Sequence, residues 1–347
     1  MRPQAATVFE LPDSLSATGP PESRGIARDD VRLLVATASG VTHVQFRDLG
    51  DFLEPPDVLV VNNSATVPAA IQGVRPDGRH VAVHLSSPLA DATYLVELRC
   101  DDGSCRIRDG RSGERIAVEG GSVRLASAYP DASTQAGSRI WRAVLDLPTD
   151  LPSYLQRHGR PITYGYVGDT WPLRDYQTVF AREPGSAEMP SAARPFSDRL
   201  VARLVATGID IVPITLHTGV SSLEADETPL SERFEVSDAA ARRINHARGA
   251  GGRVIAVGTT ATRAIESAAR DDGSVRAAQG WTDLVIGPGR GVRMVDGIVT
   301  GWHEPQASHL LLLEAVAGRR IVGRAYEAAL AERYLWHEFG DSALLLP

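Results

Sequence analysis

Short apolar runs recur along the first part of the chain, and each one ends at small or polar residues. Residues 31–35 and 41–46 are two such runs in succession, and they predict a β-hairpin. Residues 57–61 read Asp-Val-Leu-Val-Val, which is typical of a buried strand, and a polar turn follows at residues 62–64. Polar loops that follow strands often carry function. This region therefore predicts a sheet with candidate binding residues where its strands end.

The hydrophobic pattern changes between residues 69 and 150. Apolar residues now alternate with polar ones in short runs that Gly, Asp and Ser separate, and we find no helical period among them. This pattern is typical of a small β-barrel or sandwich. The strands that we predict here include residues 81–85, 94–98, 116–118, 123–125 and 141–145.

Helical and strand-like patterns alternate again from residue 151 onward. Predicted helices cover residues 197–207, 237–250, a stretch from 260 onward, and 322–336. Predicted strands cover residues 209–216, 254–257, 283–286 and 343–346. Alternation of strands and helices implies a mostly parallel sheet. We therefore predict an α/β fold in which a discontinuous α/β domain, residues 1–68 and 151–347, carries an inserted small β-barrel domain, residues 69–150.

Composition excludes several classes of protein. The 347 residues are 43% hydrophobic and 23% charged, as in an ordinary soluble protein. The formal net charge of −7 argues against a broad basic face that holds nucleic acid, although it leaves a local basic groove open. No apolar run reaches the length of a membrane span, and the N-terminus lacks the apolar stretch of a signal peptide.

The chain has two cysteines, Cys100 and Cys105. A secreted disulfide scaffold has more, so we predict a reducing, cytoplasmic location. We predict no metal site, because no second Cys or His pair stands near these cysteines. His303 and His309 superficially resemble the pair of a zinc-protease helix, but they stand six residues apart rather than four, and Pro305 interrupts a helix there.

The most informative segment is residues 253–267, where an apolar strand runs through Gly258 into a threonine cluster and then a helix. The first turn of a helix has unpaired N–H groups and a partial positive charge. Thr259 and Thr260 add hydroxyl groups at the same place, and Arg263 adds a cation. Because such a helix start binds anions, this segment predicts a small anionic or nucleotide-like ligand at the carboxyl end of the sheet.

Other candidates for chemistry follow predicted strands or apolar runs. His217 follows a strand and precedes Thr218 and Gly219, so it is either an acid/base group or a histidine that satisfies loop backbone. Trp302, His303 and Glu304 follow the apolar run 297–299. The imidazole and the carboxylate can move protons, and the indole either stacks on a purine or belongs to the core. Asp283 orients a ligand or caps a turn.

The common nucleotide-binding and hydrolase motifs are absent from this sequence. We find no Walker A motif, no Gly-x-Gly-x-x-Gly at a helix start and no Gly-x-Ser-x-Gly elbow. Any nucleotide is therefore expected to bind in another mode.

An ordered set of motifs along nearly the whole chain resembles the S-adenosylmethionine:tRNA ribosyltransferase-isomerase (QueA) family. The motifs are Phe9-Glu-Leu-Pro12, Asp57-Val-Leu-Val-Val-Asn62, Tyr176-Gln-Thr-Val-Phe180 with Gly185-Ser186, Thr215-Leu-His-Thr-Gly219, Gly258-Thr-Thr260 with Arg263 and Glu266, Thr282-Asp283, Pro288-Gly289, Val295-Asp296, Ile298-Val-Thr-Gly-Trp-His-Glu-Pro305 and Phe339-Gly-Asp341.

This resemblance implies a large α/β domain with an inserted β-barrel and implies that S-adenosylmethionine (SAM) is consumed as a co-substrate. Enzymes of the family transfer and isomerise the ribosyl group of SAM onto 7-aminomethyl-7-deazaguanine in tRNA, and they release adenine and methionine. The sulfonium acidifies the C5′ proton, so a base can form an ylide. We expect a monomer or a homodimer.

Several loops differ from the family pattern, and two alternatives therefore stay open. The family's Asn-Asp-Thr-Arg-Val is here Asn62-Asn-Ser-Ala-Thr-Val67, and its Asn-Phe-His-Leu-Pro is Gly301-Trp-His-Glu-Pro305. One alternative is a paralogue that cleaves SAM with a small-molecule acceptor, or alone as a lyase or cyclase. The other is an inactive module that binds SAM or tRNA.

The residues and the resemblance together give candidate roles, although Glu304 and Arg194 stand where this chain departs from the family pattern. Thr259, Thr260 and Arg263 would anchor the methionine carboxylate or the ribose hydroxyl groups. The rest of the SAM site would comprise Gly258, Thr218, Gly219 and Gln177, with Tyr176 and Trp302 flanking adenine. The candidate acid/base groups are His217, His303 and Glu304, and Asp283 would orient a ribose or an amine. The candidates on the acceptor side are Asn62, Asn63, Ser186 and Arg194.

Overall fold

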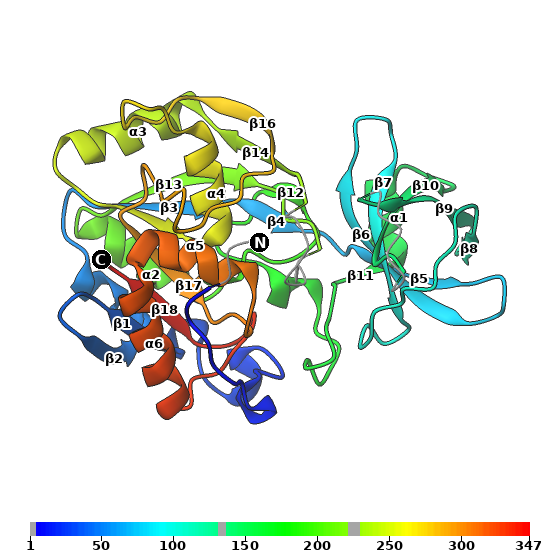
Figure 1. Cartoon of the computed structure of the whole chain (residues 1–347), viewed down its shortest axis with the longest axis horizontal. Coiled ribbons are helices and arrows are strands. Elements are labelled where there is room, and N and C mark those ends of the chain that lie inside the picture. The colour runs from blue at the N-terminus through cyan, green and yellow to red at the C-terminus, as the bar shows by residue number, and fades with distance from the viewer. Residues whose placement is uncertain (1–4, 131–136, 221–229) are drawn as a thin grey trace.

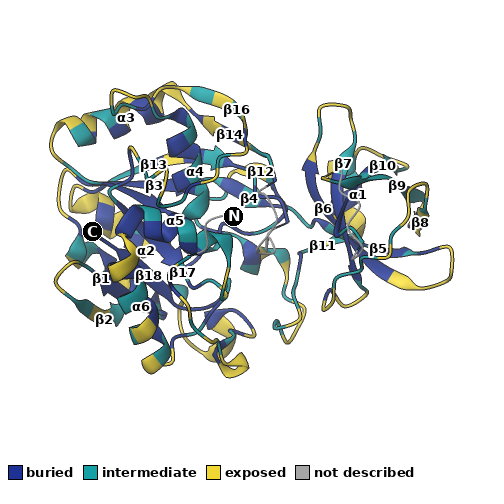
Figure 2. Cartoon of the chain, in the orientation of Figure 1, coloured by how far each residue is buried: buried dark blue, intermediate teal, exposed yellow. Residues whose placement is uncertain are grey.

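The computed structural model describes residues 5–130, 137–220 and 230–347. Figure 1 shows a large body of helices around a sheet and a smaller body of strands, connected by two stretches of chain. The buried residues gather inside each body (Figure 2). The smaller body thus has its own hydrophobic cluster, which Ala187, Val220 and Leu230 of the large body also join.

The smaller body is a closed antiparallel barrel. Its strands pair in the order β5-β6-β7-β10-β9-β8, and β8 pairs back with β5. Buried aliphatic side chains fill the interior. They alternate with more accessible positions in β5 and β8, whereas β6 and β7 are buried at nearly every position. The strands are β5 (Ala70–Val74), β6 (His80–Pro88), β7 (Tyr94–Cys100), β8 (Arg115–Val118), β9 (Gly121–Tyr129) and β10 (Ile140–Asp146).

The packing of the barrel continues past residue 150. Helix α1 (Leu151–His158) buries Tyr154 and Leu155 in the barrel core, and the short strand β11 (Gly159–Arg160) pairs with β5. The sequence analysis ended the insert at residue 150 and predicted no helix in it. The division into domains stays a prediction, but residues 151–160 pack with the barrel.

The large body is built on a nine-stranded sheet with the order β16-β14-β13-β3-β15-β17-β18-β1-β2. The pairs β13–β3, β3–β15, β15–β17 and β18–β1 are parallel, and the other four are antiparallel. The predicted α/β class with an inserted barrel is confirmed, but the sheet is mixed rather than mostly parallel, because its strands pair antiparallel at both edges and between β17 and β18. Its strands are β1 (Arg32–Ala36), β2 (Val41–Gln45), β3 (Val58–Asn62), β13 (Asp210–Leu216), β14 (Glu232–Val236), β15 (Val254–Val257), β16 (Ala278–Thr282), β17 (Gly297–Gly301) and β18 (Ser342–Leu345).

Helices cover both faces of this sheet. One face packs against α3 (Asp238–Gly249), α4 (Gly258–Ala268), α5 (Ser308–Ala317) and α6 (Arg319–Ala331), and the other packs against α2 (Asp198–Ala206). Ser197 and Ser237 cap α2 and α3 through their side-chain oxygens. A small pair, β4 (Ser64–Thr66) and β12 (Glu183–Ser186), lies outside the sheet. The 3-10 helices are Asp13–Leu15, Pro21–Arg24, Arg28–Asp30, Phe46–Phe52, Leu173–Tyr176 and Ser191–Ala193.

Two predicted elements differ in the structure. The strand predicted at residues 283–286 is wrong: this stretch is a loop, because the carbonyl group of Leu284 turns to accept a hydrogen bond from Arg263 instead of joining a ladder. The predicted C-terminal helix begins three residues earlier and ends at Ala331, and Arg333 then adopts a φ of 53°. Helix α5 was missed because its run of four leucines shows no helical period.

The two cysteines are paired in this structure. Cys100 and Cys105 form a disulfide that closes the loop after β7, a pairing that the sequence analysis did not predict. Among the described residues, no helix is both long and apolar enough to cross a membrane.

Candidate functional site

A cavity of about 420 Å³ opens where β15 and β17 end. The large body supplies most of its wall, and Arg106 of the barrel reaches into it. It lies at the carboxyl end of parallel strands, which is where open α/β sheets bind ligands. Its polar lining comprises Thr66, Arg106, Tyr164, Tyr166, Tyr176, Glu188, Ser191, Thr218, Glu232, Thr259, Thr260, Arg263, Thr300, Trp302, His303, Glu304, Gln306, His309, His337 and Glu338.

The start of α4 forms one wall of the cavity, as the sequence predicts. Gly258 has a φ of +90°, and a Cβ atom there would lie 3.1 Å from the Cβ of Ala192. This backbone conformation favours glycine. Thr259 and Thr260 follow it into the cavity wall, and no side chain caps this end of the helix. The first N–H groups of α4 therefore remain available to an anionic ligand.

Arg263 lines the same cavity, but its guanidinium group is largely occupied. It forms an ion pair with Glu232 and donates to the carbonyl groups of Thr282 and Leu284, both at 3.1 Å. Glu232 also accepts a hydrogen bond from the N–H of Gly219 at 3.1 Å. Burial raises the pKa of Glu232, although the charge of Arg263 opposes this effect. Arg263 therefore ties α4 to two neighbouring strands, and it presents only part of its charge to the cavity.

Two aromatic residues of the wall carry polar atoms without partners. The hydroxyl of Tyr176 and the indole N–H of Trp302 are buried, and neither forms a hydrogen bond with the described residues. Trp302 also packs edge-on against Tyr326, with ring centroids 5.0 Å apart. It is thus both a core residue and a cavity residue. Buried polar groups normally have partners, so these two atoms point to a ligand.

Three histidines lie around the cavity, and two of them were not predicted as site residues. The Nε2 atom of His303 lies 3.1 Å from the Thr300 hydroxyl, and its ring stacks on that of His309 at 4.6 Å. Burial lowers the pKa of His303 well below its usual value, and lowers the pKa of His309 and of His337 to about 4. All three imidazoles are therefore neutral at pH 7.

The loop after β11 brings two tyrosines into the cavity wall. Tyr164 donates its hydroxyl hydrogen to Glu188, and Tyr166 donates to Glu338 at 2.6 Å. Neither tyrosine nor either glutamate was predicted as a site residue, although the long Gly/Pro-rich segment 163–172 indicates a functional loop. The sequence holds no comparable signal for Glu338, because only the fold brings it to this loop.

His217 lies outside the cavity wall, in a hydroxyl cluster beside it. Its Nδ1 atom is 2.7 Å from the Ser64 hydroxyl, which in turn lies 2.6 Å from the Ser186 hydroxyl. Ser186 accepts the backbone N–H of Thr218 at 3.1 Å, and Thr218 itself reaches the cavity. Burial, followed by the charge of Arg233, lowers the pKa of His217.

Other predicted site residues hold neighbouring backbone in place. The Asn62 amide bridges the end of β13, since its Nδ2 donates to the Leu216 carbonyl at 2.8 Å and its Oδ1 accepts the Leu216 N–H at 3.0 Å. It also donates to the Thr260 hydroxyl at 3.3 Å, which supports the start of α4. The Gln177 amide bridges the backbone of Thr66 in the same way, at 2.8 and 3.0 Å.

Three further candidates are absent from the cavity lining. Asn63 accepts a hydrogen bond from the Thr215 hydroxyl at 2.7 Å. Arg194 is buried and forms a two-pronged ion pair with Glu22, at 3.0 and 2.8 Å. Asp283 is exposed on the loop after β16. Within the described residues, no cluster of three or more His, Cys, Asp or Glu side chains is arranged to hold a metal ion.

Comparison with known proteins gives consistent results over nearly the full chain. Residues 5–345 match the protein family described as queuosine biosynthesis protein. The S-adenosylmethionine:tRNA ribosyltransferase-isomerase of Symbiobacterium thermophilum is 36% identical, with 97% of this chain and 98% of the relative covered. The protein of the same name from Halothermothrix orenii is 34% identical, with the same coverage.

One solved structure extends the comparison to the fold. The crystal structure of an S-adenosylmethionine tRNA ribosyltransferase from Thermotoga maritima superimposes with a TM-score of 0.55 and 26% sequence identity. The superposition covers 98% of this chain and 99% of the other. Both bodies of the molecule therefore have counterparts in that structure.

Proposed function

This chain belongs to the queuosine biosynthesis protein family, and we propose that it is an S-adenosylmethionine:tRNA ribosyltransferase-isomerase. It would transfer and isomerise the ribosyl group of SAM onto 7-aminomethyl-7-deazaguanine in tRNA and release adenine and methionine. The observation that carries this proposal is the match over residues 5–345, which spans both the barrel and the α/β body. The same match disfavours the small-molecule paralogue and the inactive module.

The cavity supports this function through its size and its polar lining. A volume of about 420 Å³ lies within the range of small-molecule sites. The open start of α4, with Thr259 and Thr260, suits the methionine carboxylate or the ribose hydroxyl groups. Tyr176 and Trp302 suit the purine, because each offers a ring and an unpaired hydrogen-bond donor. Carboxylates around the cavity suit the positive charge of the sulfonium.

We assign the remaining predicted residues by whether they line this cavity. His303 and Glu304 stay candidates for proton transfer, since both line it. His217, Asn62, Asn63, Gln177 and Arg194 would act indirectly, by holding the loops that shape it. The acceptor would enter where Arg106 of the barrel meets the large body, so that SAM and the tRNA base share one cavity.

The decisive experiment uses the purified chain, SAM and tRNA that carries 7-aminomethyl-7-deazaguanine. We expect epoxyqueuosine in the tRNA by nucleoside mass spectrometry, with adenine and methionine released in equal amounts. tRNA with unmodified guanine is the control and should release neither. Adenine release that proceeds equally well with small amines, or without any acceptor, would contradict the tRNA reaction. SAM binding without breakdown under all conditions would indicate an inactive module.

A further inference from the structure

One carboxylate of the cavity wall, Glu338, is held by a tyrosine hydroxyl. It lies on the segment between α6 and β18, and it lines the cavity. The Tyr166 hydroxyl donates to its Oε2 atom at 2.6 Å. No other residue among those described donates a hydrogen bond to this carboxylate, although the backbone N–H of Glu338 itself also contacts it. Tyr166 thus holds one oxygen, and the other is open to a ligand.

Glu338 also lacks a cationic partner. Within the described parts of the chain, no Arg or His nitrogen lies within ion-pair distance of its carboxylate. Glu232, by contrast, is paired with Arg263. Glu188 accepts the Tyr164 hydroxyl as Glu338 accepts that of Tyr166, and Glu304 is exposed. Because a charge that is partly buried without an opposite charge is costly, a carboxylate in the position of Glu338 favours a cationic ligand. The sulfonium of SAM is such a cation.

The surroundings of Glu338 fix its geometry through Tyr166. The ring of His337 stacks on that of Tyr166, with centroids 3.9 Å apart and planes 12° apart. His337 adopts a φ of 73°, a left-handed conformation that few residues other than glycine adopt, and its Nε2 lies 3.3 Å from the Ser16 hydroxyl. The loop after β11 and the segment after α6 are therefore locked together at this point.

We propose that Glu338 is the base that takes the C5′ proton of SAM, and that Tyr166 is the positioning residue that holds it. This inference rests on the proposed function. In the step, the C5′–H bond breaks and its electron pair stays on C5′ beside the sulfonium sulfur, as an ylide. The proton passes to the open oxygen of the Glu338 carboxylate, which becomes a neutral carboxylic acid that Tyr166 still contacts.

Proton affinity favours Glu338 over the histidines of the same cavity. Burial raises the pKa of Glu338 above its ordinary value, and the hydrogen bonds from Tyr166 and from its own backbone N–H offset only part of that rise. The pKa values of His309 and His337 fall to about 4, so these imidazoles are weak bases. Proton transfer is most effective when the pKa of the base lies near the working pH, and burial moves Glu338 toward that range.

The test compares Glu338→Gln with Glu332→Gln, a matched control at an exposed position six residues earlier. Gln keeps the acceptor for Tyr166 but cannot take a proton. We expect Glu338→Gln to lower the rate of epoxyqueuosine formation by about 10²-fold or more, with KM for SAM changed less than tenfold. Exchange of the C5′ hydrogens of SAM with heavy water should fall in parallel. Tyr166→Phe should lower both rates about tenfold by releasing the carboxylate, and Glu332→Gln should match the wild type.

The outcomes separate this inference from the proposed function. If Glu338→Gln forms product and exchanges hydrogen within threefold of the wild type, the assignment of the base is overturned. If the wild type exchanges the C5′ hydrogens of SAM but forms no tRNA product, the tRNA function is overturned. The exchange rates of the wild type and of Glu338→Gln then decide the base assignment. If the wild type gives neither product nor exchange, both proposals fail. Unfolding temperatures equal to wild type confirm that the variants are folded.

Discussion

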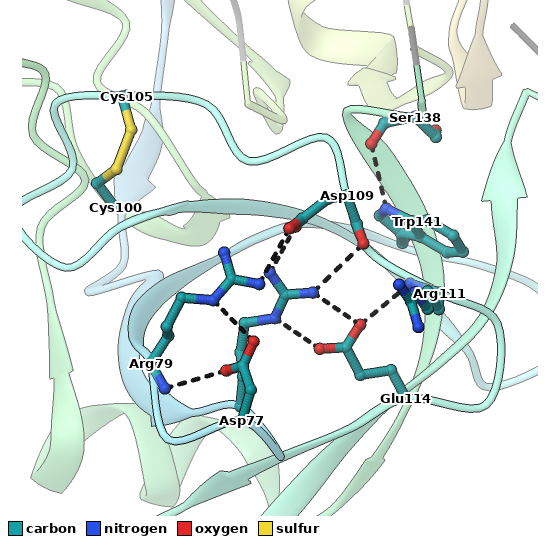
Figure 3. A network of polar contacts seen from close by, with 10 residues as sticks. Asp77, Arg79, Cys100, Cys105, Asp109, Arg111, Glu114, Ser138 and Trp141 are labelled. Carbon is teal, nitrogen blue, oxygen red and sulfur yellow. Dashed lines mark hydrogen bonds and ion pairs between the residues drawn. A yellow bond between two sulfur atoms is a disulfide. The ribbon is translucent and has the colours of Figure 1, made fainter. Parts of the chain in front are cut away.

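In the barrel a cluster of charged side chains is fully paired, whereas several groups of the cavity wall have no partner among the described residues. In the barrel, Arg75 donates to Glu114 at 2.6 Å and to Asp109 at 2.5 Å, and Arg79 donates to Asp109 at 3.0 Å. Glu114 also accepts the N–H of Arg111 at 3.0 Å (Figure 3). Hydrogen bonds to these carboxylates raise the pKa of Arg75. In this cluster, each charge faces an opposite charge.

The cavity leaves comparable groups open. Glu338 has no ion pair among the described residues, and the Tyr176 hydroxyl and the Trp302 indole N–H have no partner there. Burial without partners costs free energy, so such groups in a cavity wall favour a ligand that completes them. The cavity wall also has one closed pair, Arg263 with Glu232. We infer that the closed charge clusters stabilise the fold, and we propose that the open groups of the cavity wall bind substrate.

The largest expected effect is acid destabilisation, because both regions bury neutral histidines. Burial lowers the pKa of His84 in the barrel to about 3 and that of His309 in the cavity to about 4. Between pH of about 6.5 and 4 the unfolded chain binds protons that the folded chain rejects, so stability falls as the pH falls. We expect a loss on the order of 3 kcal/mol or more in the free energy of unfolding over this range.

Urea unfolding at a series of pH values measures this loss. His309→Gln should flatten the dependence, because Gln does not titrate. His246→Gln, at an exposed position on α3, should leave it unchanged. A free energy of unfolding that stays constant between pH 6.5 and 4 would show that these rings are not kept neutral by burial.

The next largest expected effect is a loss of stability when the ion-pair cluster of Arg75, Glu114 and Asp109 in the barrel is broken. Arg75→Met leaves the buried Glu114 carboxylate without its main partner, so we expect a loss of about 3 kcal/mol in the free energy of unfolding. Turnover per folded molecule should not change, since Arg75 lies outside the cavity. Arg79→Met is the matched control: its ion pairs are solvent-exposed and should contribute little. A large loss of turnover in folded Arg75→Met would contradict the division between closed and open clusters.

Patterns of hydrophobic residues were enough to predict most of the fold. The strands at β3 and β15 and the helices α2 and α3 follow from period and capping, because local preference and tertiary packing agree there. Helix α5 and the loop at residues 283–286 were not predictable in this way. The first is apolar on all sides, and the second is shaped by Arg263, a distant residue.

The candidate site was predictable only where chemistry and local structure coincide. The start of α4 is predictable from Gly258 and the two threonines that follow it, and it lines the cavity. His217 and Arg194 are residue types that often serve in active sites. In this structure His217 is hydrogen-bonded to Ser64, and Arg194 forms an ion pair with Glu22. Glu338 reaches the site because the fold brings the C-terminal segment against the loop after β11, a long-range contact that no local pattern encodes.

The smallest expected effect is on the free energy of unfolding when a tyrosine hydroxyl is removed. Its sign differs between the cavity and the barrel. Tyr176→Phe removes a buried hydroxyl that has no partner among the described residues, so it should raise the free energy of unfolding by roughly 1 kcal/mol. It should also weaken SAM binding by about tenfold, because the ligand loses a hydrogen bond.

Tyr154→Phe is the barrel counterpart. Its hydroxyl donates to the Glu119 carbonyl at 2.9 Å, so this change should lower stability by about 1 kcal/mol and leave SAM binding intact. Calorimetric titration with SAM and urea unfolding of both variants measure the two quantities, and a loss of stability in Tyr176→Phe would mean that its hydroxyl is satisfied within the protein.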